Sequence, residues 1–148
     1  MIEEFWIINE SGICLFHRSI NKETHEIEDR SGIQIEEQLF GGFLSGLMSF
    51  TEEMASEIIK KIELREGKFL IFTSKNLIFI VRSDLNVSDK KIKNKIAIIK
   101  ELFIEKFSKE LDAFNGEIST FTVFEKDLEE IFKKIVKSEK WGHGLLEL

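Results

Sequence analysis

The run Leu39–Phe50 constrains the fold of this chain more than any other stretch, because every residue in it is apolar or small. Pairs of acidic residues stand shortly before it and shortly after it. The run is too short to cross a bilayer, which takes about 20 apolar residues. Its length and its spacing of large side chains predict a helix over about residues 35–54, packed against a sheet.

The large and the small side chains of this predicted helix separate when the residues are placed at about 100° each. The large ones sweep through roughly half of the circumference. The small ones form a stripe at Gly42, Ser45, Gly46 and Ser49. Each interior glycine costs the helix about 0.5–1 kcal/mol, and close packing on a sheet is the expected compensation. We therefore expect the small stripe to lie near the sheet.

Three large residues are then surplus to the core and point away from its centre, namely Phe40, Leu44 and Met48. With Ile59 and Ile62 of the following segment they predict a hydrophobic groove that binds a partner or a second copy of the chain. Burial of each such side chain stabilises an interface by about 1.5–3 kcal/mol before the cost of association. In the alternative interpretation, the loop 19–34 or the tail 137–148 covers them.

The remaining segments predict five strands, one of them a half-exposed edge strand, and two further helices. Short apolar runs rich in aromatic and β-branched residues indicate strands, and charges alternating with Ile62 and Leu64 indicate a protected edge. The strands are expected at Phe5–Ile8, Ile13–Arg18, Ile58–Arg65, Phe69–Thr73 and Leu77–Val81. A long helix is expected from Ser88 or Asp89 to Asn115-Gly116, and a last one with Thr122 and Glu125 in a capping box.

The resulting order is β-β-α-β-β-β-α-α. This is the α/β class of α+β type, with a five-stranded antiparallel sheet, one helix on one face and two on the other. A chain of 148 residues is long enough for one domain with a real core, expected over 1–136 and followed by the tail. A single cysteine, Cys14, excludes an intramolecular disulfide and suits a reducing, cytoplasmic compartment.

Charge is unevenly distributed along the chain, whose net charge is −6. Residues 1–66 carry 6 basic and 14 acidic side chains, and residues 67–148 carry 15 and 13. This balance disfavours nucleic acid as a partner. The lysine-rich run Lys90–Lys95 could attract an anionic membrane or an acidic partner, although such runs are usually solvated helix faces.

No pattern of catalytic residues is present, so we expect neither enzymatic activity nor a cofactor or metal. His17, His25 and His143 have no Cys, His or acidic neighbour at metal-ligand spacing. Cys14 lies within a predicted strand, where it is expected to be a small buried residue.

The hairpin Phe5–Arg18, the run Leu39–Phe50 and the strand Leu77–Asp84 together resemble the longin domain, in particular its archaeal members. Roadblock-type domains share much of this architecture. The resemblance covers nearly the whole chain as a pattern of elements. It implies a non-enzymatic role, because longin domains are adaptor subunits, regulatory heads of SNAREs, tethering subunits and halves of exchange factors for small GTPases.

The resemblance therefore implies a protein-interaction module that regulates or binds a small GTPase or a vesicle-trafficking complex. Its partner could also be another longin or roadblock domain, including a second copy in a homodimer. Membrane association is expected only through such a partner. The alternative, from a different class, is a sensory domain of PAS- or profilin-like layering that binds a small apolar ligand in an enclosed pocket.

Overall fold

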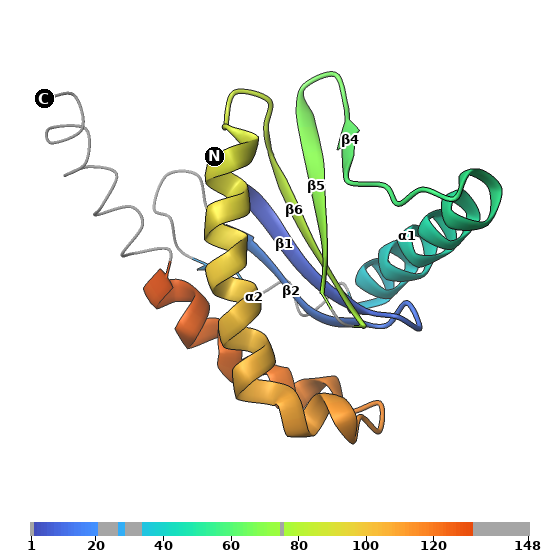
Figure 1. Cartoon of the computed structure of the whole chain (residues 1–148). Coiled ribbons are helices and arrows are strands. Elements are labelled where there is room, and N and C mark those ends of the chain that lie inside the picture. The colour runs from blue at the N-terminus through green and yellow to red at the C-terminus, as the bar shows by residue number, and fades with distance from the viewer. Residues whose placement is uncertain (1, 21–26, 29–33, 75, 132–148) are drawn as a thin grey trace, which may run out of the picture.

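Antiparallel strands form one sheet in the computed structural model, which describes residues 2–20, 27–28, 34–74 and 76–131 (Figure 1). The strands are β1 (Ile2–Asn9), β2 (Cys14–Ile20), β3 (Ile27–Glu28), β4 (Lys61–Glu63), β5 (Gly67–Ser74) and β6 (Leu77–Asp84). Their order across the sheet is β3-β2-β1-β6-β5-β4. The five expected strands are therefore present, and the two-residue strand β3 extends the sheet beyond β2.

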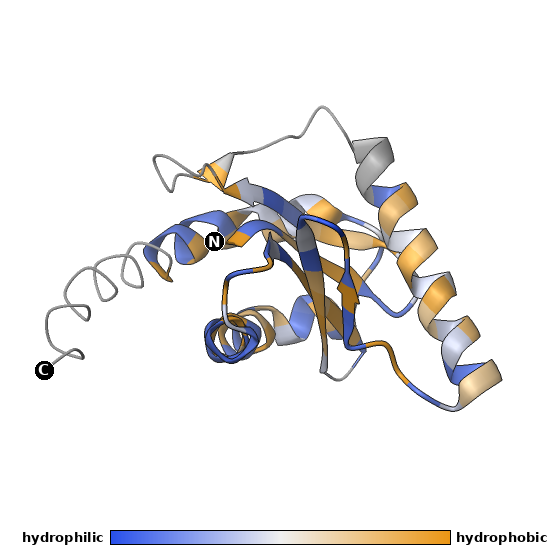
Figure 2. Cartoon of the chain, turned by 90° about the horizontal axis from the view of Figure 1, so that it is seen from above, coloured by the Kyte–Doolittle hydropathy of each residue, from blue (hydrophilic) through white to orange (hydrophobic). Residues whose placement is uncertain are grey.

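Helices cover both faces of the sheet. They are α1 (Gln34–Ala55), α2 (Asp89–Asp112) and the 3-10 helix η2 (Ile118–Val123), which runs directly into helical residues 124–131. Figure 2 shows α1 on one side of the sheet and α2 on the other. This arrangement confirms the predicted fold class. Within the described residues, neither long helix combines the length and the apolar content needed to cross a bilayer.

Alternation along the central strand β1 separates two hydrophobic cores. Phe5 and Ile7 face the core beneath α2, whereas Trp6 and Ile8 face the core beneath α1. Both neighbours of β1, the strands β2 and β6, pair with it along most of its length. A strand buried on both faces in this way reads as a continuous apolar run, which is why Phe5–Ile8 shows no polar alternation.

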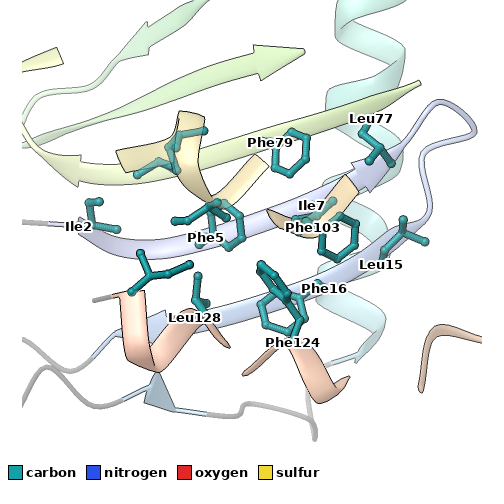
Figure 3. Packing of buried hydrophobic residues seen from close by; sticks show 14 of the residues in the cluster. Ile2, Phe5, Ile7, Leu15, Phe16, Leu77, Phe79, Phe103, Phe124 and Leu128 are labelled. Carbon is teal, nitrogen blue, oxygen red and sulfur yellow. The ribbon is translucent and has the colours of Figure 1, made fainter. Parts of the chain in front are cut away.

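The core beneath α2 is built largely from phenylalanine. Phe103 of α2 is fully buried, and its ring centroid lies 6.2 Å from Phe79 of β6 and 5.0 Å from Phe124 (Figure 3). Phe107 and Phe121 complete the group, at 4.9 Å and 5.6 Å from Phe103. Edge-to-face contacts of this kind add about 0.5–1.5 kcal/mol per pair beyond the area that they bury. This cluster fixes α2 and the last helix on one face.

Helix α2 begins where the sequence predicts, with Ser88 at the N-cap position. The Ser88 side chain makes no capping hydrogen bond, so its backbone alone turns the chain into the helix. The predicted capping box at Thr122 is wrong, because residue 122 lies inside η2 and its hydroxyl donates to the carbonyl of Ser119 at 2.8 Å. The tail 137–148 and most of the loop 19–34 lie outside the described residues.

Candidate interaction surface on helix α1

The predicted orientation of α1 is wrong. Leu44, expected to point outward, is 2 % exposed in the core beneath the helix, and Phe40 and Met48 are partly buried against the same core. The ring centroid of Phe40 lies 4.7 Å from that of Trp6 on β1 and 5.9 Å from that of Phe69 on β5. The row at 40, 44 and 48 therefore faces the sheet instead of solvent.

The large side chains of this row fill the space between α1 and the sheet. Close approach occurs at one point, where Gly41 meets the β1–β2 turn. A Cβ atom built on Gly41 would lie 2.7 Å from the carbonyl oxygen of Gly12, closer than two such atoms can approach. The glycines expected to be pressed on the sheet, Gly42 and Gly46, instead have open space beside them.

One flank of α1 is tied to the β1–β2 hairpin by polar contacts. The Gln38 side chain accepts a hydrogen bond from the Cys14 amide at 2.8 Å and donates one to the Cys14 carbonyl at 3.0 Å. Ser45 donates to the carbonyl of Glu10 at 3.4 Å. At about 100° per residue, the opposite flank carries Phe43 and Phe50. In the strand order, β1 and β2 lie toward one edge of the sheet, and β5 and β4 lie toward the other edge. The flank with Phe43 and Phe50 therefore faces the edge formed by β4.

This outward flank of α1 is strongly apolar. Four large side chains on it are well exposed: Leu39 68 %, Phe43 67 %, Phe50 60 % and Met54 72 %. Gly42, Gly46 and Ser49 lie beside them and are exposed as well. Figure 2 shows hydrophobic bands along almost the whole helix, consistent with an apolar side chain on both the sheet side and the solvent side.

The strand β4 continues this surface at the edge of the sheet. It pairs on one side only, with β5, and is three residues long, shorter than the predicted Ile58–Arg65. Ile59 and Ile62 are partly buried against the core beneath α1, so they link that core to the edge. We refer to Leu39, Phe43, Phe50 and Met54 together with β4 as the α1–β4 surface.

Charges flank Ile62 on β4. Lys61 donates to Glu63 at 2.8 Å and to Asp89, at the start of α2, at 2.9 Å. The contact with Glu63 is the main cause that raises the pKa of Lys61, and Asp89 adds to it. Hydrogen bonds from Lys68 and then Lys61 lower the pKa of the Asp89 carboxyl. The edge strand therefore carries a matched pair of opposite charges, one on each side of a hydrophobic residue.

Sequence reasoning placed the four exposed residues of α1 in the core and missed them as a surface. Large apolar side chains occur around most of the helix, so their periodicity does not show which side faces the sheet. One signal was available in Glu53, which stands seven residues after Gly46 and so lies on the same side of the helix. A carboxylate on one side of a helix indicates that this side faces solvent, and Glu53 is indeed exposed.

The histidine and cysteine side chains that the structure describes, His17 and Cys14, make structural contacts. His17 is buried, with its Nε2 atom 2.9 Å from a carboxylate oxygen of Glu4 and its ring stacked 4.8 Å from that of Trp6. The Cys14 thiol is buried and donates to the carbonyl of Phe16. Among the described residues, no three His, Cys, Asp or Glu side chains are grouped so as to hold a metal ion. His25 and His143 lie outside those residues.

A cavity of about 310 Å³ opens at one end of the sheet, away from the α1–β4 surface. The β1–β2 turn, Asn76 and the second half of α2 line it, with Leu15, Leu77 and Phe114 as apolar contributors. The sensory alternative requires a pocket enclosed between sheet and helix. This cavity lies between the ends of β2 and β6 and the second half of α2, and it is partly open beside the β1–β2 turn. Its lining is about as polar as it is apolar, so it is not the enclosed apolar pocket that this alternative requires.

The comparisons with known proteins support the fold. No protein-family model matches the chain, and no curated protein matches it in sequence. Among solved structures, it is similar to the Roadblock/LC7 domain from Streptomyces avermitilis, with a TM-score of 0.50 and 9 % identity. The match covers 74 % of this chain and 85 % of that one. This likeness supports a roadblock/longin-like fold, which the order of elements predicts.

Proposed function

We propose that this chain is a protein-interaction module that associates with a second copy of itself through the α1–β4 surface. The observation that carries the proposal is the exposure of four large apolar side chains along a helix whose opposite side is already packed on the sheet. Monomeric proteins seldom leave such a continuous apolar row in water.

The row is symmetric along α1, which favours a second copy over an unrelated partner. Leu39 and Met54 stand equally far from the point between Gly46 and Leu47, and so do Phe43 and Phe50. If a two-fold axis passes near that point, antiparallel helices bring Phe43 of one copy to Phe50 of the other. An interface built on a two-fold axis requires this kind of self-complementarity.

Small residues beside the row let two such helices approach closely. Gly42, Gly46 and Ser49 project almost nothing from the exposed side of the helix, and no atom lies within 4 Å of a Cβ built on either glycine. Full burial is worth about 1.5–3 kcal/mol for each large side chain, and two copies contribute eight of them. Association costs about 4–15 kcal/mol in lost freedom, so the apolar contribution is large enough to decide the outcome.

The edge strand β4 supports the same symmetry. Antiparallel pairing with its own copy about Ile62 sets Lys61 opposite the partner's Glu63, twice across the axis. Opposite charges facing each other across strands stabilise the pair, whereas like charges would oppose it. Such pairing uses the side of β4 that has no strand beside it in the described residues and joins two sheets into one.

The experiment is a measurement of molecular mass in solution by sedimentation or light scattering over a range of concentrations. The wild type is expected to be a dimer, and Phe43→Asp a monomer, because the new carboxylate would be buried at the interface. Ile98→Asp is the matched control, since it adds the same charge at an exposed apolar position of α2 on the opposite face. A wild type that stays monomeric, or a Phe43→Asp variant that stays dimeric, contradicts the proposal.

A small GTPase or a trafficking-type complex is the further partner that the longin resemblance suggests for such a module. This part of the proposal rests on the resemblance alone. Purified dimer immobilised on beads is expected to retain a small GTPase from native extract, identified by mass spectrometry. Failure to enrich any GTPase or trafficking subunit, in either nucleotide state, contradicts this part and leaves self-association to its own test.

A further inference from the structure

The first half of α2 carries an unusual concentration of positive charge. Lysines stand at positions 90, 91, 93, 95 and 100, and no acidic residue lies between Asp89 and Glu101. Lys90, Lys91 and Lys93 are exposed and form no ion pair within the described part of the chain, whereas Lys95 has a partner. The patch is thus open to solvent on a molecule whose net charge is negative.

This placement does not help the helix itself. The N-terminal end of a helix bears a partial positive charge, and a cation in the first turn typically costs about 0.3–1 kcal/mol. Lys90 and Lys91 are in that turn, where Asp89 is the acidic residue. Asp89 is already bonded to Lys61 and Lys68 of the sheet. Lys90 and Lys91 therefore do not stabilise this end of α2, which points to a ligand of opposite charge.

Apolar side chains continue the same patch. Ile98 and Leu102 are 50 % and 40 % exposed, although α2 already buries a full apolar face on the core. Lys91, Lys95, Ile98 and Leu102 follow one another at steps of four, three and four residues, so they form one row along the helix. The row passes from two ammonium groups to two aliphatic side chains. We call these four residues, together with Lys90 and Lys93, the α2 patch.

We propose that the α2 patch docks directly on an anionic lipid surface. Each lysine near such a surface contributes about 1 kcal/mol, and shallow insertion of Ile98 and Leu102 adds to it. The ammonium groups are flexible and spread around much of the helix. Mobile lipid headgroups can rearrange to meet them, whereas a protein partner would need carboxylates fixed at matching positions. This contact goes beyond membrane association through a partner.

In the proposed dimer, the arrangement of sheet and helices would place two α2 patches on the same side of the molecule. Helix α2 lies on the face of the sheet opposite to α1 (Figure 1). If β4 pairs antiparallel with its copy, the two-fold axis stands perpendicular to the sheet, so both α2 helices lie on the same side. Two patches on one side bind a membrane bivalently, which raises apparent affinity without any new contact. This doubling rests on the proposed dimer, whereas the patch itself does not.

The experiment is flotation of the full chain with vesicles of phosphatidylcholine, with or without about 30 % phosphatidylserine. Binding is expected only to the vesicles that contain phosphatidylserine. It should weaken at least tenfold when NaCl is raised from about 0.1 M to about 0.5 M, because the screening length shortens. Salt-insensitive or equal binding to both kinds of vesicle would overturn the proposal.

Charge-reversed variants locate the binding surface. Lys90→Glu/Lys91→Glu is expected to abolish flotation, and it should not impair folding because acidic residues suit a helix N-terminus. Lys109→Glu/Lys126→Glu changes the net charge by the same amount at exposed positions outside the patch, and it should still float. Ile98→Ser/Leu102→Ser is expected to bind several-fold more weakly and to keep its salt dependence. Equal loss in both charge-reversed variants would overturn the assignment to the α2 patch.

Two outcomes separate this inference from the proposed function. Phe43→Asp, if monomeric, should still bind phosphatidylserine vesicles, with lower apparent affinity. A wild type that remains unbound at every phosphatidylserine content overturns the lipid contact and favours an acidic protein segment as the ligand of the α2 patch. That result would leave the dimer standing.

Discussion

Glycines of α1 occupy two different environments although they are neighbours in sequence. Gly41 is buried against the backbone of the β1–β2 turn, and the limiting atom is the carbonyl oxygen of Gly12, which belongs to a residue at φ +85°. The amides of Gly12 and Ile13 both donate hydrogen bonds to Asn9, so this turn is held in place beside the helix. Gly46, one and a half turns further along α1, faces solvent. The same residue type therefore serves close packing at one position and leaves space for a partner at the other.

This contrast predicts opposite effects of one substitution. Gly41→Ala should lower the free energy of unfolding, since its methyl group collides with Gly12. Gly46→Ala should raise that of the monomer by about 0.5–1 kcal/mol, because alanine favours the helix and meets nothing. Urea unfolding of both variants in the Phe43→Asp background separates this effect from self-association. Equal destabilisation by the two substitutions would contradict the assigned environments.

At the scale of elements, the start of α2 is held to the sheet by Lys68 of β5. Lys68 is almost fully buried, and its ammonium donates to the carbonyl of Val87 and to the carboxylate of Asp89, each at 2.5 Å. Lys61 of the edge strand reaches the same carboxylate. One acidic residue thus connects β4, β5 and α2. The α2 patch and the α1–β4 surface are joined through it.

The stability of this junction should depend on pH. The pKa of Asp89 is lowered from its ordinary value of 3.8, first by Lys68 and then by Lys61. Its contribution to stability is therefore full above the unfolded pKa and is lost as pH falls through the lower folded pKa. Wild type should be more stable than Asp89→Asn by a constant amount near neutral pH. The difference between their urea midpoints should shrink below about pH 4.

Asp112→Asn is the matched control for that measurement. Asp112 is an exposed residue at the last position of α2 and makes no ion pair in the described part of the chain. Its substitution should leave the acid dependence of the urea midpoint close to that of the wild type. A difference for Asp89→Asn that persists unchanged into acid would mean that the junction acts through packing rather than charge.

The whole molecule is a sheet with two unequal cores. The core beneath α2 is closed by the phenylalanine cluster and by the last helix, whereas among the described residues a single helix covers the core beneath α1. That helix leaves its outer flank and the neighbouring strand β4 open. Association on the open side would therefore complete the less protected half of the molecule.

Self-association should make thermal stability depend on concentration. The midpoint of unfolding of the wild type should rise as the protein concentration increases, because the dimer is favoured by mass action. The midpoint of Phe43→Asp should not change over the same range. Differential scanning calorimetry at several concentrations checks both expectations. A concentration-independent wild type would agree with a monomer and contradict the proposed dimer.

Much of the fold followed from local patterns in the sequence. The strands Phe69–Thr73 and Leu77–Val81 were predicted because β-branched and aromatic runs suit a strand buried on both faces. The inward row of α2 was predicted because Ile92, Ile96 and Phe103 recur on one face of a helix whose remaining surface is mostly polar. In each case the local pattern of residues was compatible with one structure, so the element could be predicted without information from the rest of the chain.

Tertiary structure alone decided the direction in which α1 faces. Its sequence is apolar on both sides, so either side could have been buried with a similar gain in free energy. The choice was made by contacts between residues far apart in sequence: Gln38 with Cys14, Gly41 with Gly12, and Phe40 with Trp6. The sequence by itself determined that this helix has apolar side chains to spare. Only packing against the hairpin and the sheet determined which of them remain for a partner.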